Sequence, residues 1–353
     1  MSELLARLDR AWKGRISGCQ LGKAVEILSL RDGYDALAAY LAQVGAAPVR
    51  DYLEFRPHLR IFETCCRGRM RRSEPDDDIN YSLLALILLE EHGAALETVD
   101  VARGWLRLLP PGMTYTAERA AYATLMHLAS ERFADGADPG FDLGECSLNR
   151  YNDWIGAQIR ADLYGWVCPG RPSQAAALAR KDAALSHRGD GVEGAAFVAA
   201  LGAALAESEP ERALSQALGE IAAGSGAAAA VRFGRSLVGQ PDSGARIRAE
   251  YAALSPVHTL NNLAIVVWAL YSNLGDFSAA IGEAVAAGLD TDCNGATVGG
   301  LWGIQGAEIP ANWTSPWNGR VGVSLAGHDE LAIEALVART AAVALRIADA
   351  EAQ

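Results

Sequence analysis

The stretch from Thr259 to Tyr271, Thr-Leu-Asn-Asn-Leu-Ala-Ile-Val-Val-Trp-Ala-Leu-Tyr, is apolar on nearly every face of the helix that it predicts. A helix without a polar side has to be buried inside a larger helical assembly. Its apolar run is also shorter than the roughly 18 residues that a membrane span requires. This stretch therefore predicts a helical protein with at least one fully enclosed helix.

The rest of the chain follows the same helical pattern, with abundant alanine and almost no alternation of β-branched residues. Helices are expected at 34–45, 79–92, 96–108, 115–134, 152–163, 173–187, 193–207, 210–223, 226–238, 243–254, 259–273, 276–287, 292–304 and 329–350. No linker rich in glycine, serine or proline interrupts them, and no fixed-period repeat suggests a solenoid. The sequence therefore predicts an all-α fold forming one compact domain over residues 1–353.

Composition narrows the kind of partner. The formal net charge is -12, and the dense basic run is confined to the segment from Arg67 to Arg72. Nucleic-acid binders usually carry a basic patch or stripe, so this class of partner is not expected. The basic run itself predicts either a solvated loop or a group of side chains that binds a phosphate near the adjacent aspartates.

The N-terminus and the cysteines predict a location in the cell. Residues 1–13 have the pattern of an amphipathic helix, not of a signal peptide, and no apolar run is long enough to span a membrane. The six cysteines include no CxxC pair. Such cysteines are typical of reduced thiols, so we expect a cytoplasmic protein that does not associate with membranes.

Two short runs of aspartate stand out against this apolar background: Asp76-Asp77-Asp78 and Asp290-Thr291-Asp292. A helix N-terminus favours one or two acidic residues, and helix capping is therefore the alternative explanation. Adjacent carboxylates repel one another, however, and five of them beside buried helices need compensating cations. Oxygen-rich clusters suit hard divalent cations such as magnesium, calcium or manganese, so the two runs predict a metal site.

The two runs and four other segments together resemble the ADP-ribosylglycohydrolase family, which includes the dinitrogenase reductase-activating glycohydrolases and the ADP-ribosyl-acceptor hydrolases. The resemblance covers most of the chain. The matching segments are Gly14–Glu26 (an opening glycine-rich helix), Asp76–Asp78 (the first metal motif), Ile155–Arg160 (a central segment), Ser186-His187 with Gly191, Asp290–Asn294 (the second metal motif) and Ile309-Pro310 with Trp313. Each segment is weak evidence alone, whereas their order and spacing together are specific.

The resemblance implies an orthogonal bundle of helices with a binuclear, usually magnesium, centre in a cleft. It assigns the metal ligands to Asp76, Asp77, Asp78, Asp290, Asp292 and Cys293. Asp76 stands where the family usually has threonine, and Cys293 stands where threonine or serine is usual. Because a thiol is a poor ligand for magnesium, manganese or a different coordination is expected at the second site. Calcium is a further alternative for the ion.

The resemblance also implies hydrolysis of a glycosidic bond at the anomeric carbon of an ADP-ribose-like sugar. Glu26, Asp77 and Asp292 are the candidates for catalysis, because a carboxylate can accept the proton of an attacking water. The candidates for substrate binding are Asn149, Trp154, Gly156, Arg160, His187, His258 and Asn262. Four of these have structural alternatives: an ion pair for Arg160, packing for His187, and helix capping at His258 and Asn262.

Three functions are consistent with these features. The expected substrate is an ADP-ribosylated protein or a small ADP-ribosyl or ribosyl compound. Hydrolysis of a small N-glycoside or nucleoside is an alternative, since Trp154, Asp162, Tyr164 and Trp166 surround the central segment. A non-catalytic relative that binds ADP-ribose is the third function, and only Cys293 favours it.

Overall fold

The computed structural model describes residues 2–306 and 308–351 and is helical almost throughout. The α-helices are α1 (Ser2–Lys23), α2 (Tyr34–Gln43), α3 (Asp77–His92), α4 (Thr98–Leu108), α5 (Thr116–Leu128), α6 (Asp162–Trp166), α7 (Pro172–Ala183), α8 (Gly189–Leu205), α9 (Pro210–Gly219), α10 (Gly226–Ser236), α11 (Ser243–Glu250), α12 (Thr259–Ser272), α13 (Phe277–Ala286), α14 (Thr291–Ile304), α15 (Ala311–Thr314) and α16 (Ile333–Glu351). The all-α prediction is confirmed, whereas the division into a single domain stays a prediction.

Shorter elements connect these helices. They are a π-helical turn at Leu28–Asp32 and 3-10 turns at Glu63–Cys65, Gly93–Ala95, Pro111–Met113, Phe133–Asp135, Leu143–Ser147, Ile155–Arg160 and Ser315–Trp317. Two strands, β1 (Arg320–Gly322) and β2 (Glu330–Ala332), pair antiparallel. No helix in the part of the chain that the structure describes is long and apolar enough to cross a membrane.

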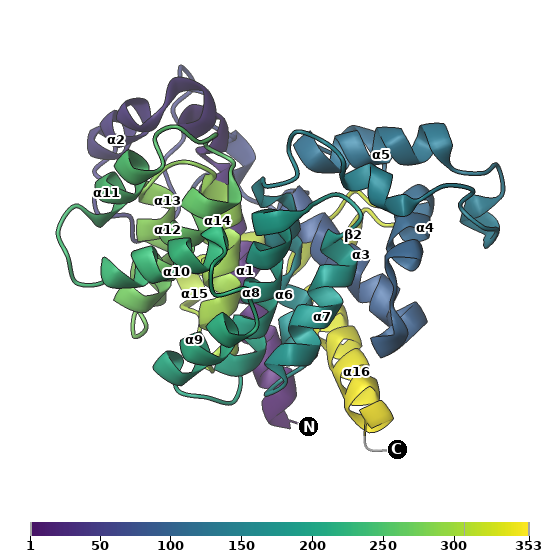
Figure 1. Cartoon of the computed structure of the whole chain (residues 1–353). Coiled ribbons are helices and arrows are strands. Elements are labelled where there is room, and N and C mark those ends of the chain that lie inside the picture. Colours follow the sequence, from purple (N-terminus) through teal and green to yellow (C-terminus); the bar gives the residue numbers. More distant parts are fainter. Residues whose placement is uncertain (1, 307, 352–353) are drawn as a thin grey trace.

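The centre of the molecule is formed by helices that are buried on all sides. Every residue of α14 is buried, and α12 and α8 are buried along most of their length. In Figure 1, α1, α8 and α14 lie centrally, α2, α11 and α13 lie on one side, and α4 and α5 lie on the other. The stretch from Thr259 to Tyr271 thus forms the enclosed helix that its apolar surface predicts.

Helices α1 and α14 run antiparallel with almost no side-chain layer between them. A Cβ atom at Gly18 would overlap the carbonyl oxygen of Gly295, and one at Gly22 would overlap the carbonyl oxygen of Thr291. Glycine is required at both positions because any larger residue would force the two backbones apart. The consequence for the site is that the end of α1 lies against the start of α14.

The helices expected at 173–187, 210–223 and 243–254 each end four residues earlier in the structure, and three further expected helices differ where a tertiary contact forms. The helix expected at 152–163 is a 3-10 turn followed by α6, and the Ile155 amide bonds to Val257 at 3.0 Å. The helix expected at 115–134 ends at Leu128, and the Ser130 amide then bonds to Pro139 at 2.9 Å. The last helix begins at Ile333 because the preceding residues pair with β1.

Candidate metal centre and substrate cavity

The two acidic runs occupy the starts of two helices that open on the same cavity. Asp76 is the N-cap of α3, where its side chain accepts a hydrogen bond of 3.0 Å from the Asp78 amide. Asp290 precedes the first residue of α14, and Asp292 lies in its first turn. Four of the five aspartates, together with Cys293, line one cavity of about 480 Å³. The helix macrodipoles favour negative charge at both places.

A strained turn directs the second run towards the cavity. Gly288 and Leu289 have φ values of 79° and 62°, a backbone conformation that is costly for leucine. The Ser29 hydroxyl donates to the Leu289 carbonyl at 2.8 Å, which holds the turn in place. Asn262 is buried behind this turn, and its Oδ1 accepts hydrogen bonds from the Asp290 amide at 3.3 Å and from Asn294 Nδ2 at 2.8 Å. Asn262 therefore positions the second run and does not line the cavity.

The side chains of the two runs form candidate metal-binding triads. Within the described residues, the donor atoms of three groups each lie within 4.8 Å of one another: Asp76, Asp77 and Asp292; Asp78, Asp292 and Cys293; and Cys19, Asp76 and Asp78. Asp290 belongs to none of these triads, although it lines the cavity. The structure thus brings together residues that are more than two hundred positions apart.

The residues present fit a divalent ion. Asp78 Oδ2 and Asp292 Oδ1 are buried and have no hydrogen-bond partner among the described residues. Burying a carboxylate oxygen without a partner is costly, and a coordinated cation removes that cost. Carboxylates as the majority donors suit a hard or borderline cation, whereas the Cys293 thiol favours a softer one.

The carboxylates of the centre titrate abnormally. Burial, followed by the neighbouring carboxylates, raises the pKa values of Asp77, Asp78 and Asp290 well above the ordinary range. Burial and Asp76 raise the pKa of Asp292 to about 6. Burial and Asp292 raise the pKa of Glu26 to about 10. Without a cation the centre therefore retains protons, and a bound ion would displace them.

Two cations of the protein itself lie in the same region. Lys23 Nζ is 2.6 Å from Asp76 Oδ2, and Arg15 Nη2 is 3.2 Å from Asp78 Oδ1. Arg15 is fully buried and also pairs with Asp162 below the cavity. Burial opposes the ionisation of Asp76, but the Lys23 ammonium outweighs it, so the pKa of Asp76 lies below its ordinary value. Lys23 lines the cavity, and the sequence analysis did not select it.

The remaining cavity wall is largely aromatic and apolar. Glu26 lines it close to the metal triads, and Phe62, Tyr115 and Trp154 contribute three aromatic rings. Tyr115 is 50% exposed and Phe62 is 39% exposed, and a cation lies over each ring, Arg119 over Tyr115 and Lys23 over Phe62. Arg31 is exposed and also belongs to the wall. The wall thus combines aromatic rings with a positive charge.

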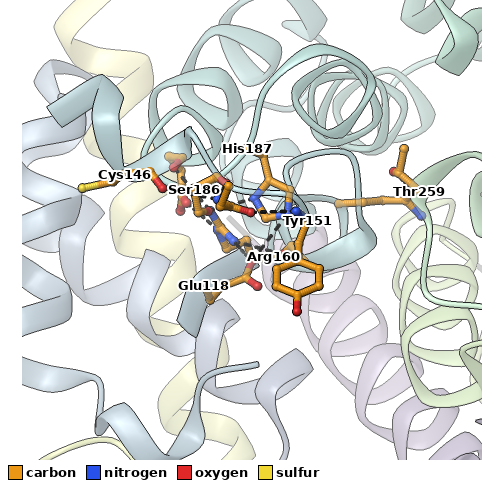
Figure 2. A network of polar contacts seen from close by, with 11 residues as sticks. Glu118, Cys146, Tyr151, Arg160, Ser186, His187 and Thr259 are labelled. Atoms are coloured by element: carbon orange, nitrogen blue, oxygen red, sulfur yellow. Dashed lines mark hydrogen bonds and ion pairs between the residues drawn. The ribbon is translucent and has the colours of Figure 1, made fainter. Parts of the chain in front are cut away.

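Arg160 pairs with Glu118, a residue of the cavity wall, in the network of polar contacts that Figure 2 shows. Its guanidinium is 2.5 Å from Glu118 Oε1 and 2.5 Å from Asp182 Oδ1, and it donates to Ser186 Oγ at 2.9 Å. Glu118 reaches the cavity wall beside Gly156, where a Cβ atom would overlap the carboxylate. Arg160 is thus an ion-paired residue that does not line the cavity itself, and Gly156 makes room for its partner.

Three other predicted binding residues lie in the surrounding structure. Asn149 Nδ2 donates to the Ser186 carbonyl at 2.9 Å, and His258 Nδ1 accepts from the Leu260 amide at 3.2 Å as the N-cap of α12. His187 Nδ1 lies 2.8 Å from Ser186 Oγ, and burial lowers the pKa of this histidine well below its ordinary value. None of the three lines the cavity, whereas Trp154 and Gly156 do. Substrate contact by any of them stays a prediction.

The basic run also lies apart from the cavity. Arg67 pairs with Asp51 at 3.1 Å, and Arg69 pairs with Glu63 at 3.2 Å, with more than half of each arginine side chain exposed. Arg31 does line the cavity, but no motif or charge pattern around it in the sequence indicated a binding residue. The same is true of Glu118, an acidic residue in an ordinary first helical turn.

Fold and site together define a helical protein with an acidic cavity whose residues could hold a metal ion. The chain belongs to the ADP-ribosylglycohydrolase family, whose family model matches residues 1–346. It is accordingly a hydrolase acting on glycosyl bonds, in a metal-dependent family that acts on ADP-ribosylated substrates. The resemblance stated from the sequence motifs is confirmed.

A solved structure has the same fold. It is described as an "ADP-ribosylglycohydrolase-related protein complex", shares 21% sequence identity and superposes with a TM-score of 0.59. The match covers 98% of this chain and 99% of the other. The search of curated proteins found no match.

Proposed function

We propose that this protein hydrolyses the glycosidic bond at the anomeric carbon of an ADP-ribosyl or related ribosyl group, with divalent metal held between the two acidic runs. The observation that carries the proposal is the cavity on which both helix starts open, since it combines four aspartates with aromatic walls, and Asp292 among them has a buried oxygen without a partner. The sequence predicts magnesium at two adjacent positions, with manganese or calcium as alternatives. The triads supply the donors for such a centre.

The carboxylates have distinct roles in this proposal. A bound divalent ion supplies positive charge that orients ribose oxygens and makes a coordinated water more acidic. Asp77 and Asp292 hold the metal and are placed to accept a proton from the attacking water. Glu26 lines the cavity next to them and holds a proton in the metal-free protein, because burial and the surrounding carboxylates raise its pKa to about 10. It is our candidate for orienting the substrate or exchanging a proton with it.

The cavity wall suggests how an ADP-ribosyl group is bound. Tyr115, Phe62 and Trp154 provide faces on which an adenine ring can stack, an interaction worth about 1–3 kcal/mol per base. Arg31 is the wall residue suited to a phosphate. Because Asn149, His187, His258 and Asn262 form hydrogen bonds around this wall, we propose that they position it.

The proposal is tested by product analysis. The purified protein is incubated with ADP-ribosyl-arginine, ADP-ribosyl-serine and a panel of nucleosides, with manganese or magnesium present. Release of ADP-ribose is expected, and Asp77→Asn should reduce its rate by about 100-fold or more, as is typical when a catalytic carboxylate is lost. Asp329→Asn is the matched control, because the Asp329 side chain is 90% exposed and does not line the cavity.

Each other result selects a different function. Release of free ribose or nucleobase from nucleosides, without ADP-ribose from the first two substrates, would establish the N-glycoside alternative. Binding of ADP-ribose with no turnover of any substrate would identify a non-catalytic relative. Equal activity of Asp77→Asn and the unmodified protein would contradict the proposed role of the first run.

A further inference from the structure

Lys23 places a permanent positive charge inside the acidic centre. It is the last residue of α1, and its side chain is 15% exposed. Its ammonium lies 2.6 Å from Asp76 Oδ2 and 5.0 Å from the centre of the Phe62 ring. A cation is favoured at the end of one helix and an anion at the start of another, so the macrodipoles of α1 and α3 both stabilise this pair.

Both carboxylate oxygens of Asp76 are already engaged by the protein. Oδ2 pairs with Lys23, and Oδ1 accepts a 3.0 Å hydrogen bond from the Asp78 amide as the cap of α3. An ion that used Asp76 would have to share one of these oxygens with Lys23 or with the Asp78 amide. It would also lie next to the Lys23 ammonium, and two positive charges this close repel each other.

The remaining donors converge on a different position. Two of the three triads in the described chain contain Asp76, and the third consists of Asp78, Asp292 and Cys293. This third triad contains both oxygens that lack a partner, Asp78 Oδ2 and Asp292 Oδ1. Asp78 is fully buried and Asp292 is 2% exposed, so bulk solvent hardly reaches these atoms.

We propose that Lys23 takes the place of one of the two expected divalent ions, leaving a single resident ion at Asp78, Asp292 and Cys293. The inference rests on the metal dependence of the proposed function, and it changes the number of bound ions per chain from two to one. In this arrangement Asp76 is the counter-ion of Lys23 and not a metal ligand. Asp77 then no longer holds the metal, and together with Asp290 it lines the cavity beside the ion and holds solvent or substrate hydroxyls.

The donor set also selects the kind of ion. Two carboxylates and one thiolate suit manganese, iron, cobalt or zinc better than magnesium, which prefers oxygen ligands alone. A coordinated thiol is deprotonated by the ion itself, so Cys293 serves as a thiolate ligand when the ion is bound. Arg15 holds the other oxygen of Asp78 at 3.2 Å and therefore leaves one Asp78 oxygen for the ion.

The experiment measures metal stoichiometry instead of activity. The whole protein is stripped with a chelator, loaded with manganese, dialysed, and analysed for bound metal and by electron paramagnetic resonance. We expect one ion per chain and the six-line spectrum of an isolated manganese ion. Lys23→Gln and Lys23→Met remove the ammonium and should bind a second ion, with the spectrum of a coupled pair.

Lys13→Gln is the matched control on the same helix. Lys13 forms a partly buried pair with Asp9 at 2.7 Å and does not line the cavity, so this variant should retain one ion. Two ions of similar affinity in the unmodified protein would overturn the inference, even if neither Lys23 variant folds. A single ion in folded Lys23→Gln and Lys23→Met would overturn it as well.

A second experiment tests whether Cys293 is a ligand of the ion. Cys293→Ser replaces the thiol by a hydroxyl, and we expect the preference for zinc over magnesium to fall by about tenfold or more, as ligand softness requires. An unchanged preference would remove Cys293 from the ligand set. The absence of any bound ion would contradict the proposed function too, whereas two ions with continued release of ADP-ribose would contradict only the inference drawn from Lys23.

Discussion

Arg160 illustrates how one buried charge supports the cavity without lining it. The guanidinium joins Glu118, which lines the cavity, to Asp182 and Ser186 behind it. Desolvating three charged groups is expensive, and the arrangement is stable only because each group has a partner. At the scale of the residue, the position of a cavity-lining carboxylate therefore depends on a side chain that substrate is not expected to reach.

Replacing Arg160 by methionine should strongly destabilise the protein. The substitution leaves Glu118 and Asp182 buried without their cation, and breaking such a pair costs about 3–5 kcal/mol. The free energy of unfolding, measured by urea denaturation, should fall by that amount. Arg235→Met is the control, because the pair of Arg235 with Glu211 is exposed and should contribute less than about 1 kcal/mol. Equal losses for both variants would contradict the structural role of Arg160.

Helix α14 determines where the second acidic run lies. Its first turn carries Asp292 and Cys293, and its backbone packs directly against that of α1. The same packing brings Lys23, at the end of α1, next to the acidic centre. At the scale of the element, the geometry of the metal centre follows from how closely two glycine-containing helices approach each other.

Gly18→Ala should disturb both stability and metal binding. The added methyl group overlaps the carbonyl oxygen of Gly295, and overpacking of this kind typically costs about 1–3 kcal/mol. Calorimetric titration with manganese should show weaker binding, because α14 has to move away from α1.

Gly219→Ala is the matched control at the end of α9, where a Cβ atom would meet nothing within 4 Å. This variant should change stability by less than about 1 kcal/mol, in the stabilising direction. Unchanged manganese affinity in a folded Gly18→Ala protein would show that the contact between α1 and α14 does not determine the centre.

The whole molecule concentrates negative charge in a buried cavity, and this makes its stability depend on pH and metal. A carboxyl group whose pKa is raised by folding stabilises the folded state fully at any pH below its ordinary pKa. This contribution to the free energy of unfolding is lost as the pH rises through the pKa that the group has in the folded protein. The pKa of Asp292 rises to about 6 and that of Glu26 to about 10. Asp76 has a lowered pKa, so its contribution to the stability of the folded state increases as the pH rises. This contribution is fully present above the ordinary pKa of 3.8.

The metal-free protein should therefore become less stable as the pH rises from about 4 to about 10, first through Asp292 and then through Glu26. Urea midpoints measured with a chelator present should decline over this range, and Glu26→Gln should make the decline shallower. Manganese should largely remove the pH dependence and, at a hundred times its dissociation constant, add about 2.7 kcal/mol to the free energy of unfolding. Identical pH profiles with and without manganese would contradict a metal centre built from these carboxylates.

The sequence alone determined the helical class and the location of the acidic centre. Helical periodicity and helix ends depend on residues about four positions apart, so the enclosed helix from Thr259 and the helix start at Asp76 were readable locally. The two aspartate runs were visible because they contain more negative charge than capping explains. The family followed from the order of such local motifs.

The tertiary structure alone decided which side chains meet. Lys23 and Asp76 are 53 positions apart, and their contact depends on how α1 packs against its neighbours. Glu118 likewise lines the cavity because Arg160 and Gly156 place it there, while His258 and Asn262 are used in hydrogen bonds around α12 and the turn before α14. The physical reason is that these contacts depend on distances between helices, which local propensity does not encode.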